Sequence, residues 1–539
     1  MPDILLIQPP IADFYLTAKR TIPYGLACIA AAAMQKGFSV TILDALATGK
    51  SRITAPPEVL KDLAPFYGRA DRSPLALFHP FRHYGYSLEH IGRQAKASGA
   101  FLVGIAAMFT AYSEMALAVA RVVKANLPAS TVVLGGHHAT ALPAAVMAEP
   151  AVDVVLRGEG EVSLPVLAEA VRSGADLTRV PGIVLRNPDG SLHIGDPAVC
   201  REMNRIPVPA FELIRRKFYR RRGRDSIVVT AGRGCPLACS YCATGADSWM
   251  GFRQRPVAAV LQEIRAAAED GQVGFIDFED ENLTLDRHWF LELMAGIRDI
   301  FGEVPPELRA MNGLFPPTLR QEVVRAMKRN GFKALNLSLG SANVDQLKRF
   351  RRPDVRGAFD RALDYAAQEG LSAVGYIIVG APDQNPISSV DDLLFLARRR
   401  VLAGVSVYYP APGSLDYERC QDLGLLPAAF DAMRATALPI DQRTSRTDTA
   451  TLLRLGRLLN FIKHLQDIGM PIPRAEEIGD HLDPSLDRRQ VGLRLLAAFL
   501  LDGGIRGIEP DGTVYDHQVS VDLCKRFLSG LSSICLRYN

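Results

Sequence analysis

Short apolar runs alternate with helical patterns over the first 180 residues of the chain. Apolar residues recur with helical spacing from Tyr24 to Lys36 and again over residues 112–125. Strands that alternate with helices in this way favour a doubly wound α/β sheet, which binds ligands at the carboxyl ends of its strands. The runs that predict buried strands cover residues 3–7, 39–44, 101–105, 131–134 and 152–156.

A second series of strand-like runs begins at residue 226. Helical patterns separate these runs, the clearest over residues 256–268, so the series predicts a partial (β/α)₆ barrel that is open on one side. Near the C-terminus, the amphipathic stretch Leu452–Lys463 is expected to close the open side and to shape a substrate pocket. The six runs cover residues 226–231, 273–279, 307–312, 334–340, 373–379 and 403–409.

These patterns divide the chain into four predicted parts. They are a Rossmann-like sheet domain over residues 1–180, a hairpin and linker over 181–224, the barrel over 225–420 and a mainly helical, substrate-shaping region over 421–539. Residues 46–100 form an unusually long connection within the first part. This connection either covers a ligand or substrate, or it packs as a surface insertion on its own aromatic side chains.

Composition adds few constraints to this picture. The chain has 539 residues, of which 48% are hydrophobic, and a net charge of +4, so no polyanionic partner is indicated. The basic run at residues 215–224 fits a solvated linker, and no nucleic acid is expected. Eight cysteines are too sparse for a disulfide scaffold, and neither a signal peptide nor a transmembrane segment is apparent. These features favour a cytoplasmic location.

Three cysteines, Cys235, Cys239 and Cys242, stand in a glycine-rich loop after the first barrel strand. Thiolates are the ligands of iron–sulfur clusters, and such a loop lets three of them converge. Three cysteines leave one iron of a [4Fe–4S] cluster open to another ligand. A zinc site would need a second Cys or His pair, and none lies nearby in the sequence. Three unrelated thiols are the plainer alternative.

The spacing C-x₃-C-x₂-C resembles the signature of radical SAM enzymes, in which the open iron binds S-adenosylmethionine (SAM). The resemblance implies that Tyr241 lies near the adenine. Asp280 and Glu281 match the acidic motif of the family's second strand and would hold the SAM amino group, unless they form a solvated acidic turn. The fourth strand end lacks the glutamate that relatives often carry there. The weaker candidates for SAM contacts are Asn312, Ser338, Gly380 and Pro382.

The first domain resembles the cobalamin-binding domain that precedes many radical SAM barrels. The matching segments are GGHHATALP at residues 135–143 and LRGEGEVSLP at residues 156–165. The loop QPPIADFY at residues 8–15 lacks the histidine that ligates cobalt in other cobalamin domains, so we expect no protein histidine as the lower ligand. A flavodoxin-like domain without a cofactor is the alternative. The resemblance implies cobalamin contacts at Pro9, Thr110, Gly135, Gly136, His137, Gly158 and Glu159.

The two modules together resemble cobalamin-dependent radical SAM enzymes, with a [4Fe–4S] cluster, SAM and cobalamin as cofactors. The resemblance implies methylation of an unactivated carbon by way of a 5′-deoxyadenosyl radical, on a small-molecule, lipid or peptide substrate. A flavodoxin or ferredoxin would supply the electron. A non-methylating cyclase, oxidase or rearrangement enzyme and a cobalamin or SAM sensor stay open. A methylthiotransferase is disfavoured, because only Cys28 and Cys200 precede the motif and a second cluster needs three cysteines.

Overall fold

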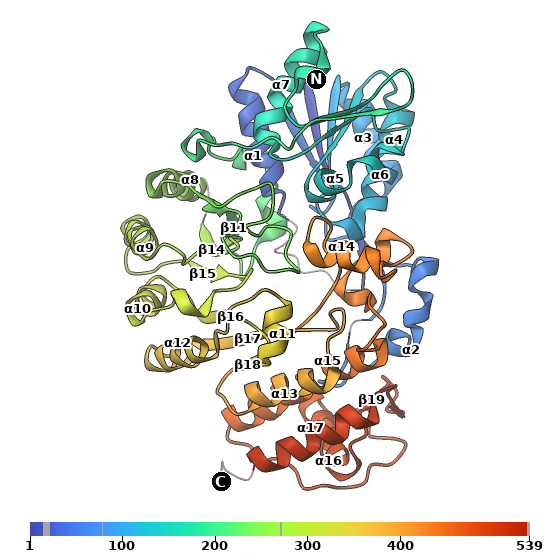
Figure 1. Cartoon of the computed structure of the whole chain (residues 1–539), viewed down its shortest axis with the longest axis vertical. Coiled ribbons are helices and arrows are strands. Elements are labelled where there is room, and N and C mark those ends of the chain that lie inside the picture. The colour runs from blue at the N-terminus through green and yellow to red at the C-terminus, as the bar shows by residue number, and fades with distance from the viewer. Residues whose placement is uncertain (15–21, 78, 270–271, 536–539) are drawn as a thin grey trace.

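The computed structural model describes residues 1–14, 22–77, 79–269 and 272–535, so Tyr15 and Phe78 of the segments discussed above lie outside the described residues. The N-terminal sheet domain, the barrel and the C-terminal helices follow one another along the long axis of the molecule (Figure 1). In the described part of the chain, no helix is both long enough and apolar enough to span a membrane.

The first domain is built on a seven-stranded sheet in the order β10-β9-β8-β7-β6-β1-β3. Its five parallel strands confirm the predicted doubly wound sheet, and their order reverses between β1 and β6, where such sheets bind ligands. Side chains of β1 alternate between two cores, with Ile4 and Leu6 on one side and Leu5 and Ile7 on the other. The parallel strands are β1 (Ile4–Gln8), β3 (Val40–Asp44), β6 (Leu102–Ala106), β7 (Thr131–Gly135) and β8 (Val154–Leu156).

Helices cover both faces of this sheet (Figure 1). Residues of α1 and α7 pack in the core that contains Ile4, whereas residues of α3 and α4 pack in the core that contains Leu5. Two short helices follow β7 near the ligand-binding edge. The helices are α1 (Tyr24–Gln35), α3 (Leu88–Ser98), α4 (Ser113–Asn126), α5 (His137–Ala141), α6 (Pro143–Met147) and α7 (Gly160–Ser173).

The predicted hairpin joins the first domain instead of standing outside it. Its strands are β9 (Ile183–Arg186) and β10 (Leu192–Ile194), and β9 pairs antiparallel with β8. The hairpin therefore covers the edge that the parallel strands leave exposed. The sequence pattern placed it with the linker because a local pattern does not identify the strand that a hairpin will join.

Six parallel strands form the predicted partial barrel, but their hydrogen bonding is interrupted once. They pair as two three-stranded sheets, β11-β14-β15 and β16-β17-β18. Between β15 and β16 the contacts include an isolated bridge of Leu314 with Leu337 and a hydrogen bond of 3.1 Å from Asn336 Nδ2 to the carbonyl of Ala310. The strands are β11 (Asp225–Val229), β14 (Val273–Phe278), β15 (Glu307–Ala310), β16 (Ala334–Gly340), β17 (Ser372–Val379) and β18 (Leu402–Val407).

Helices on the outside of the barrel connect successive strands (Figure 1). Short elements at the strand ends complete the rim, including the ribbon of β12 and β13 that flanks the cysteine loop. The helices are α8 (Val257–Glu269), α9 (Arg287–Phe301), α10 (Gln321–Arg329), α11 (Val344–Arg349), α12 (Arg356–Gln368) and α13 (Pro386–Ala397), and the short strands are β12 (Gly232–Arg233) and β13 (Arg253–Gln254).

Helix α15 (Arg446–Asp467) packs on the open side of the barrel, beside β18. The side chain of Asn460 pairs with the backbone of Ala403: its Nδ2 donates to the carbonyl at 2.8 Å and its Oδ1 accepts the N–H at 2.7 Å. The amide thus takes the place of a neighbouring strand at this edge. The other elements of the C-terminal region are α14 (Leu415–Asp422), α16 (Arg488–Asp502), β19 (Arg506–Ile508), β20 (Val514–Asp516) and α17 (Val521–Cys535).

The long connection after β3 bridges the first domain and the C-terminal region. Arg454 of α15, which is buried, donates to the carbonyls of Leu75 at 3.2 Å and Phe66 at 3.0 Å. His517 Nε2 lies 3.1 Å from Asp71 Oδ2, and both side chains are buried. The connection therefore packs on distant parts of the chain and not only on its own aromatics. It contains β4 (Ser51–Ile53), η2 (Glu58–Leu63), α2 (Ala64–Tyr67) and β5 (Arg82–Tyr84), and β5 pairs with β4 and with β2 (Ile11–Asp13).

Candidate cofactor sites

The three cysteines lie in one loop at the carboxyl end of β11. Two backbone hydrogen bonds shape the loop, from the N–H of Cys235 to the carbonyl of Thr244 at 3.0 Å and from the N–H of Cys242 to the carbonyl of Cys239 at 3.1 Å. Gly234 has a φ of +74°, and a Cβ there would lie 2.3 Å from the carbonyl oxygen of Gly251. Only glycine therefore fits at the entrance to the loop.

The donor set of this loop fits an iron–sulfur cluster. Burial raises the pKa of the Cys235 thiol, and the neighbouring Cys239, Cys242 and Glu281 add to this effect, so these four groups lie close together. Among the described residues, no three Cys, His, Asp or Glu side chains converge as ligands of a single ion. A four-iron cluster binds each cysteine to a different iron, so its thiolates stand further apart. Three thiols in one loop therefore fit three of the four ligand positions of such a cluster.

Asp280 and Glu281 both follow β14, but their carboxylates have different surroundings. Asp280 is buried, and its carboxylate accepts the N–H groups of Ala231 at 3.1 Å and Gly232 at 2.6 Å. Burial raises its pKa to about 7. Asp280 therefore holds the start of the cysteine loop. Because both of its carboxylate oxygens already accept backbone N–H groups, it is less suited to bind SAM than the resemblance implies.

The Glu281 carboxyl has the surroundings of an incomplete ligand site. Burial raises its pKa to about 7, while its own backbone N–H and Arg233 lower it. Within the described residues, no other side chain is hydrogen-bonded to it. Next to it, Asn282 is 4% exposed, and neither amide atom has a hydrogen-bond partner in the same residues. Unsatisfied buried polar groups are costly, so this pair fits a site completed by a polar ligand.

Two of the weaker candidates for SAM contacts are engaged by the protein itself. Ser338 Oγ donates to the carbonyl of Leu314 at 3.0 Å and accepts a hydrogen bond of 3.0 Å from Arg352. Asn312 Nδ2 donates to the carbonyl of Glu279 at 2.9 Å, at an exposed position.

The turn after β17 carries the remaining pair of candidates. Gly380 has a φ of +77°, and a Cβ there would lie 3.0 Å from Thr449 Oγ1. Pro382 beside it is buried. Close packing against α15 therefore explains this glycine.

The glycines at the edge of the first domain are required by packing within the protein. Gly136 has a φ of +118°, and a Cβ there would lie 2.8 Å from the carbonyl oxygen of Ala107. Gly158 has a φ of +88°, and a Cβ there would lie 2.2 Å from the carbonyl oxygen of Ala198. The resemblance to cobalamin domains implies that both glycines let cobalamin approach. Contacts between adjacent loops already explain them, whereas Gly135 has more space.

The switch point of the first domain presents accessible side chains close to the barrel. His137 is exposed, and desolvation lowers its pKa, with a further contribution from the charge of Arg233 in the barrel. Met108 and Phe109, in the loop after β6, are 44% and 52% exposed. Large exposed apolar side chains at the carboxyl edge of such a sheet fit a large ligand.

Two other polar groups at this edge are less accessible. Thr110 Oγ1 lies 3.1 Å from Nδ1 of His138, which is buried. Pro9 begins the loop after β1, and no histidine occurs in the described part of that loop. The absence of a histidine cobalt ligand from this loop therefore stays a prediction.

Glu159 docks the two domains on each other. Its carboxylate forms ion pairs of 2.8 Å with Arg253 and 2.9 Å with Arg233, and Arg233 also pairs with Glu161 at 2.5 Å. Arg233 precedes the first cysteine by two residues. A carboxylate held by two arginines is not free for cobalamin, so the structure gives Glu159 a different role from the expected one. The sequence did not reveal this because Arg233 and Arg253 lie far from Glu159 along the chain, the second of them 94 residues away.

The cysteine loop lies against the first domain. A Cβ built on Gly413, in the loop after β18, would lie 3.9 Å from Cβ of Ala243 and 4.0 Å from Cβ of Ala141. Ala243 follows Cys242 directly, and Ala141 ends α5. The cysteine loop and the loop after β18 therefore both lie next to the carboxyl edge of the first domain's sheet.

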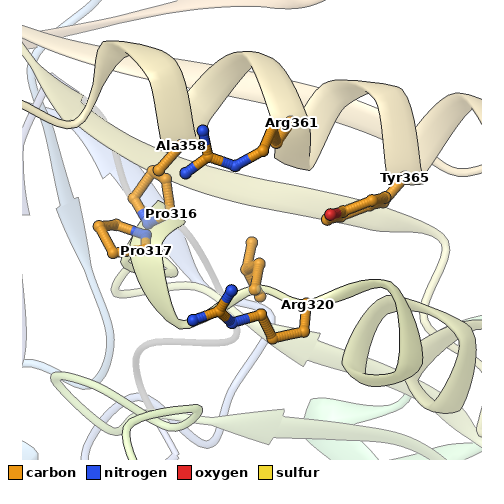
Figure 2. A pocket seen from close by; sticks show the side chains of 7 residues that line it. Pro316, Pro317, Arg320, Ala358, Arg361 and Tyr365 are labelled. Carbon is orange, nitrogen blue, oxygen red and sulfur yellow. The ribbon is translucent and has the colours of Figure 1, made fainter.

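Two hollows lie away from these groups. One, of about 190 Å³, lies on the outside of the barrel, where Arg320 at the start of α10 faces Arg361 of α12 (Figure 2). The other, of about 520 Å³, is lined by Lys50, Arg52 and Arg93 among others. Neither contains a residue predicted to bind a cofactor.

The sequence matches two family models and several named proteins. Residues 229–396 match the radical SAM superfamily and residues 79–168 the B12 binding domain. An uncharacterised methyltransferase of Pyrococcus horikoshii is 26% identical over 59% of this chain and 68% of its own length. Cytidylyl-2-hydroxyethylphosphonate methyltransferase of Streptomyces wedmorensis is 24% identical over 70% and 73%. Anaerobic magnesium-protoporphyrin IX monomethyl ester cyclase of Rubrivivax gelatinosus is 28% identical over 70% and 66%.

A solved structure supports the same arrangement of domains. The radical SAM methyltransferase TsrM of Kitasatospora setae, with cobalamin and a [4Fe–4S] cluster bound, matches with a TM-score of 0.59 and 15% identity. The match covers 79% of this chain and 76% of that one. This likeness supports the fold, and in this chain the segment that matches the B12 binding domain precedes the one that matches the radical SAM superfamily. The protein is a member of the cobalamin-dependent radical SAM enzymes, whose cofactors are a [4Fe–4S] cluster, SAM and cobalamin.

Proposed function

We propose that the protein methylates an unactivated carbon of a small-molecule, lipid or peptide natural product. This proposal is carried by the proximity of Ala243, Ala141 and Gly413. It places the cysteine loop against the edge of the cobalamin domain. A reaction that uses both cofactors on one substrate needs this proximity. The methyltransferase names of two relatives support the same reaction.

In this proposal the side chains hold and orient the cofactors. The bound cofactors supply reductive cleavage of SAM to a 5′-deoxyadenosyl radical and the carriage of a methyl group. Cys235, Cys239 and Cys242 bind the cluster, Glu281 orients the SAM amino group, and Asp280 positions the cysteine loop. Met108 and Phe109 exclude water from the space beside the corrin. The remaining proposed contacts are Tyr241, Asn312, Ser338, Gly380 and Pro382 for SAM, and Pro9, Thr110, Gly135, Gly136, His137 and Gly158 for cobalamin.

A second candidate function is a radical cyclisation or oxidation without methyl transfer. The cyclase of Rubrivivax gelatinosus favours it, because that relative matches as much of this chain as the Streptomyces methyltransferase does. In either case the enzyme needs a one-electron reductant, for which we propose a flavodoxin or a ferredoxin.

Anaerobic reconstitution separates these functions. Protein loaded with iron, sulfide and hydroxocobalamin is reduced and mixed with SAM that carries a deuterated methyl group. A methyltransferase is expected to transfer this group to cobalamin and to release S-adenosylhomocysteine, measured by mass spectrometry. Formation of 5′-deoxyadenosine without S-adenosylhomocysteine favours the cyclase. Intact cofactors with no SAM product of either kind would contradict both and favour a sensor.

Substitution of Glu281 tests its role in SAM binding. Loss of a charge-assisted hydrogen bond costs about 1.5–3 kcal/mol, so Glu281→Gln is expected to weaken SAM binding roughly 10- to 100-fold. Calorimetric titration of the cluster-loaded protein with SAM measures the dissociation constant, and iron content is compared with the wild type. An unchanged dissociation constant would remove Glu281 from the SAM site.

Two further variants make this test specific. Glu292→Gln removes the same charge from the exposed side of α9 and is expected to leave SAM affinity unchanged. Asp280→Asn removes the charge that holds the N–H groups of Ala231 and Gly232. It is therefore expected to lower cluster content, whereas Glu281→Gln keeps it.

A further inference from the structure

Arg352 is a buried cation in direct contact with the cysteine loop. Its side chain is 8% exposed, and its Nη1 lies 3.7 Å from Sγ of Cys239, within hydrogen-bonding distance for sulfur. The same nitrogen lies 3.2 Å from the hydroxyl of Tyr241. Nη2 donates to the carbonyl and to the hydroxyl of Ser338, the latter at 3.0 Å. One guanidinium therefore joins β16 to a cluster ligand.

The positive charge of Arg352 has no carboxylate partner. Its contacts are a thiol, two hydroxyls, a carbonyl and the ring of Phe315, whose centroid lies 5.5 Å from the guanidinium carbon. Among the described residues, no Asp or Glu oxygen comes within ion-pair distance of it. A buried cation is costly unless an anion compensates it. The Cys239 sulfur is the group in contact that becomes an anion when it binds iron.

The segment that carries Arg352 is fixed to the cysteine loop by other bonds. The backbone N–H of Ser240 donates to the carbonyl of Phe350 at 3.0 Å, and its hydroxyl donates to the carbonyl of Arg349 at 3.1 Å. The rings of Tyr241 and Phe350 pack edge to face, with centroids 5.1 Å apart. The backbone segments that carry Arg352 and Cys239 are thus fixed to each other, which keeps the guanidinium within reach of the sulfur.

We propose that Arg352 is a positioning residue that raises the reduction potential of the cluster through its N–H contact with Cys239. Reduction adds one electron from the external reductant to a cluster that already carries thiolate charge. A fixed cation beside a ligand sulfur stabilises the reduced form more than the oxidised form, because the reduced form has the greater negative charge. A hydrogen bond donated to a ligand sulfur also favours the reduced form and so raises the reduction potential. The proposal rests on the cluster assignment and not on methyl transfer.

The test measures the cluster potential in the absence of SAM and substrate. Wild-type protein and Arg352→Gln are loaded with the cluster anaerobically and titrated with a reductant, and the reduced cluster is quantified by electron paramagnetic resonance. Arg352→Gln is expected to shift the midpoint potential to a more negative value. Arg352→Lys keeps the charge but lacks the planar guanidinium group. Its midpoint potential is expected to lie between those of the wild type and Arg352→Gln.

A matched control separates a local contact from overall charge. Arg351 precedes Arg352 but is exposed, at 3.9 Å from Asp247, so Arg351→Gln removes the same charge outside the loop and is expected to keep the wild-type potential. Equal potentials in the wild type, Arg352→Gln and Arg352→Lys would overturn the proposal, as would an equal shift in Arg351→Gln. If Arg352→Gln fails to retain the cluster, the potential of Arg352→Lys decides: a negative shift supports the proposal and a wild-type value overturns it.

Discussion

Replacement of Cys239 by alanine is expected to abolish the formation of 5′-deoxyadenosine. Cys239 lies at the centre of the cysteine loop, and Arg352 contacts its sulfur. Without its thiolate, one iron of the cluster loses its protein ligand, and the remaining pair of cysteines cannot hold the cluster in place. Iron and sulfide analysis, the visible absorption spectrum and chromatography of SAM products measure the effect.

Cys200→Ala is the matched control for this variant. Cys200 is partly exposed and lies outside the cysteine loop, and its sulfur donates to the carbonyl of Glu202 at 3.4 Å. This variant is expected to keep the full cluster content and the wild-type rate of SAM cleavage. Deoxyadenosine formation that persists in Cys239→Ala would contradict the assignment of the cysteine loop.

Glu263→Ala is expected to destabilise the barrel by about 3–5 kcal/mol, because it leaves Arg255 as an unpaired buried charge. The two side chains form an ion pair of 2.6 Å and are 2% and 0% exposed. Tyr24 of the first domain also donates to Glu263 at 3.0 Å, so the substitution weakens the contact between the domains as well. Urea unfolding of the cofactor-free protein measures the loss.

Tryptophan fluorescence suits this measurement, since the indole N–H of Trp289 donates to the carbonyl of Arg255 at 2.8 Å and so reports on the affected region. Glu322→Ala, which breaks an exposed pair with Arg287, is expected to change stability by less than about 1 kcal/mol. Replacement of both Arg255 and Glu263 by methionine is expected to recover much of the loss. Equal effects of Glu263→Ala and Glu322→Ala would contradict the importance of the buried pair.

Local patterns were enough to predict the parallel strands, because an apolar run depends on residues that are close in the sequence. The cysteine spacing is equally local, and the ligand loop that it predicts stays a prediction. The interruption of hydrogen bonding between β15 and β16, by contrast, occurs where β15 is short. There the side-chain amide of Asn336 donates to the carbonyl of Ala310. No period in the sequence records such an interruption.

Individual roles at the site were harder to predict than its location. Asp280 and Glu281 are adjacent acidic residues that the sequence does not distinguish. In the structure, the N–H groups of Ala231 and Gly232 bind the Asp280 carboxylate and not that of Glu281. Glu159 was assigned to cobalamin because its arginine partners lie in another domain. Arg352 was missed altogether, since a lone arginine far from the cysteines carries no signal until the fold brings it to Cys239.

The attachment of the connection after β3 to α15 and to His517 has a consequence for synthesis of the protein on the ribosome. Asp71 belongs to the first part of the chain to emerge, whereas Arg454 and His517 emerge among the last. The N-terminal domain can fold its parallel sheet early, but the contacts of this connection with α15 and His517 must wait for nearly the whole chain. A nascent or truncated chain would therefore expose this segment to proteases and chaperones, while the completed enzyme hides it.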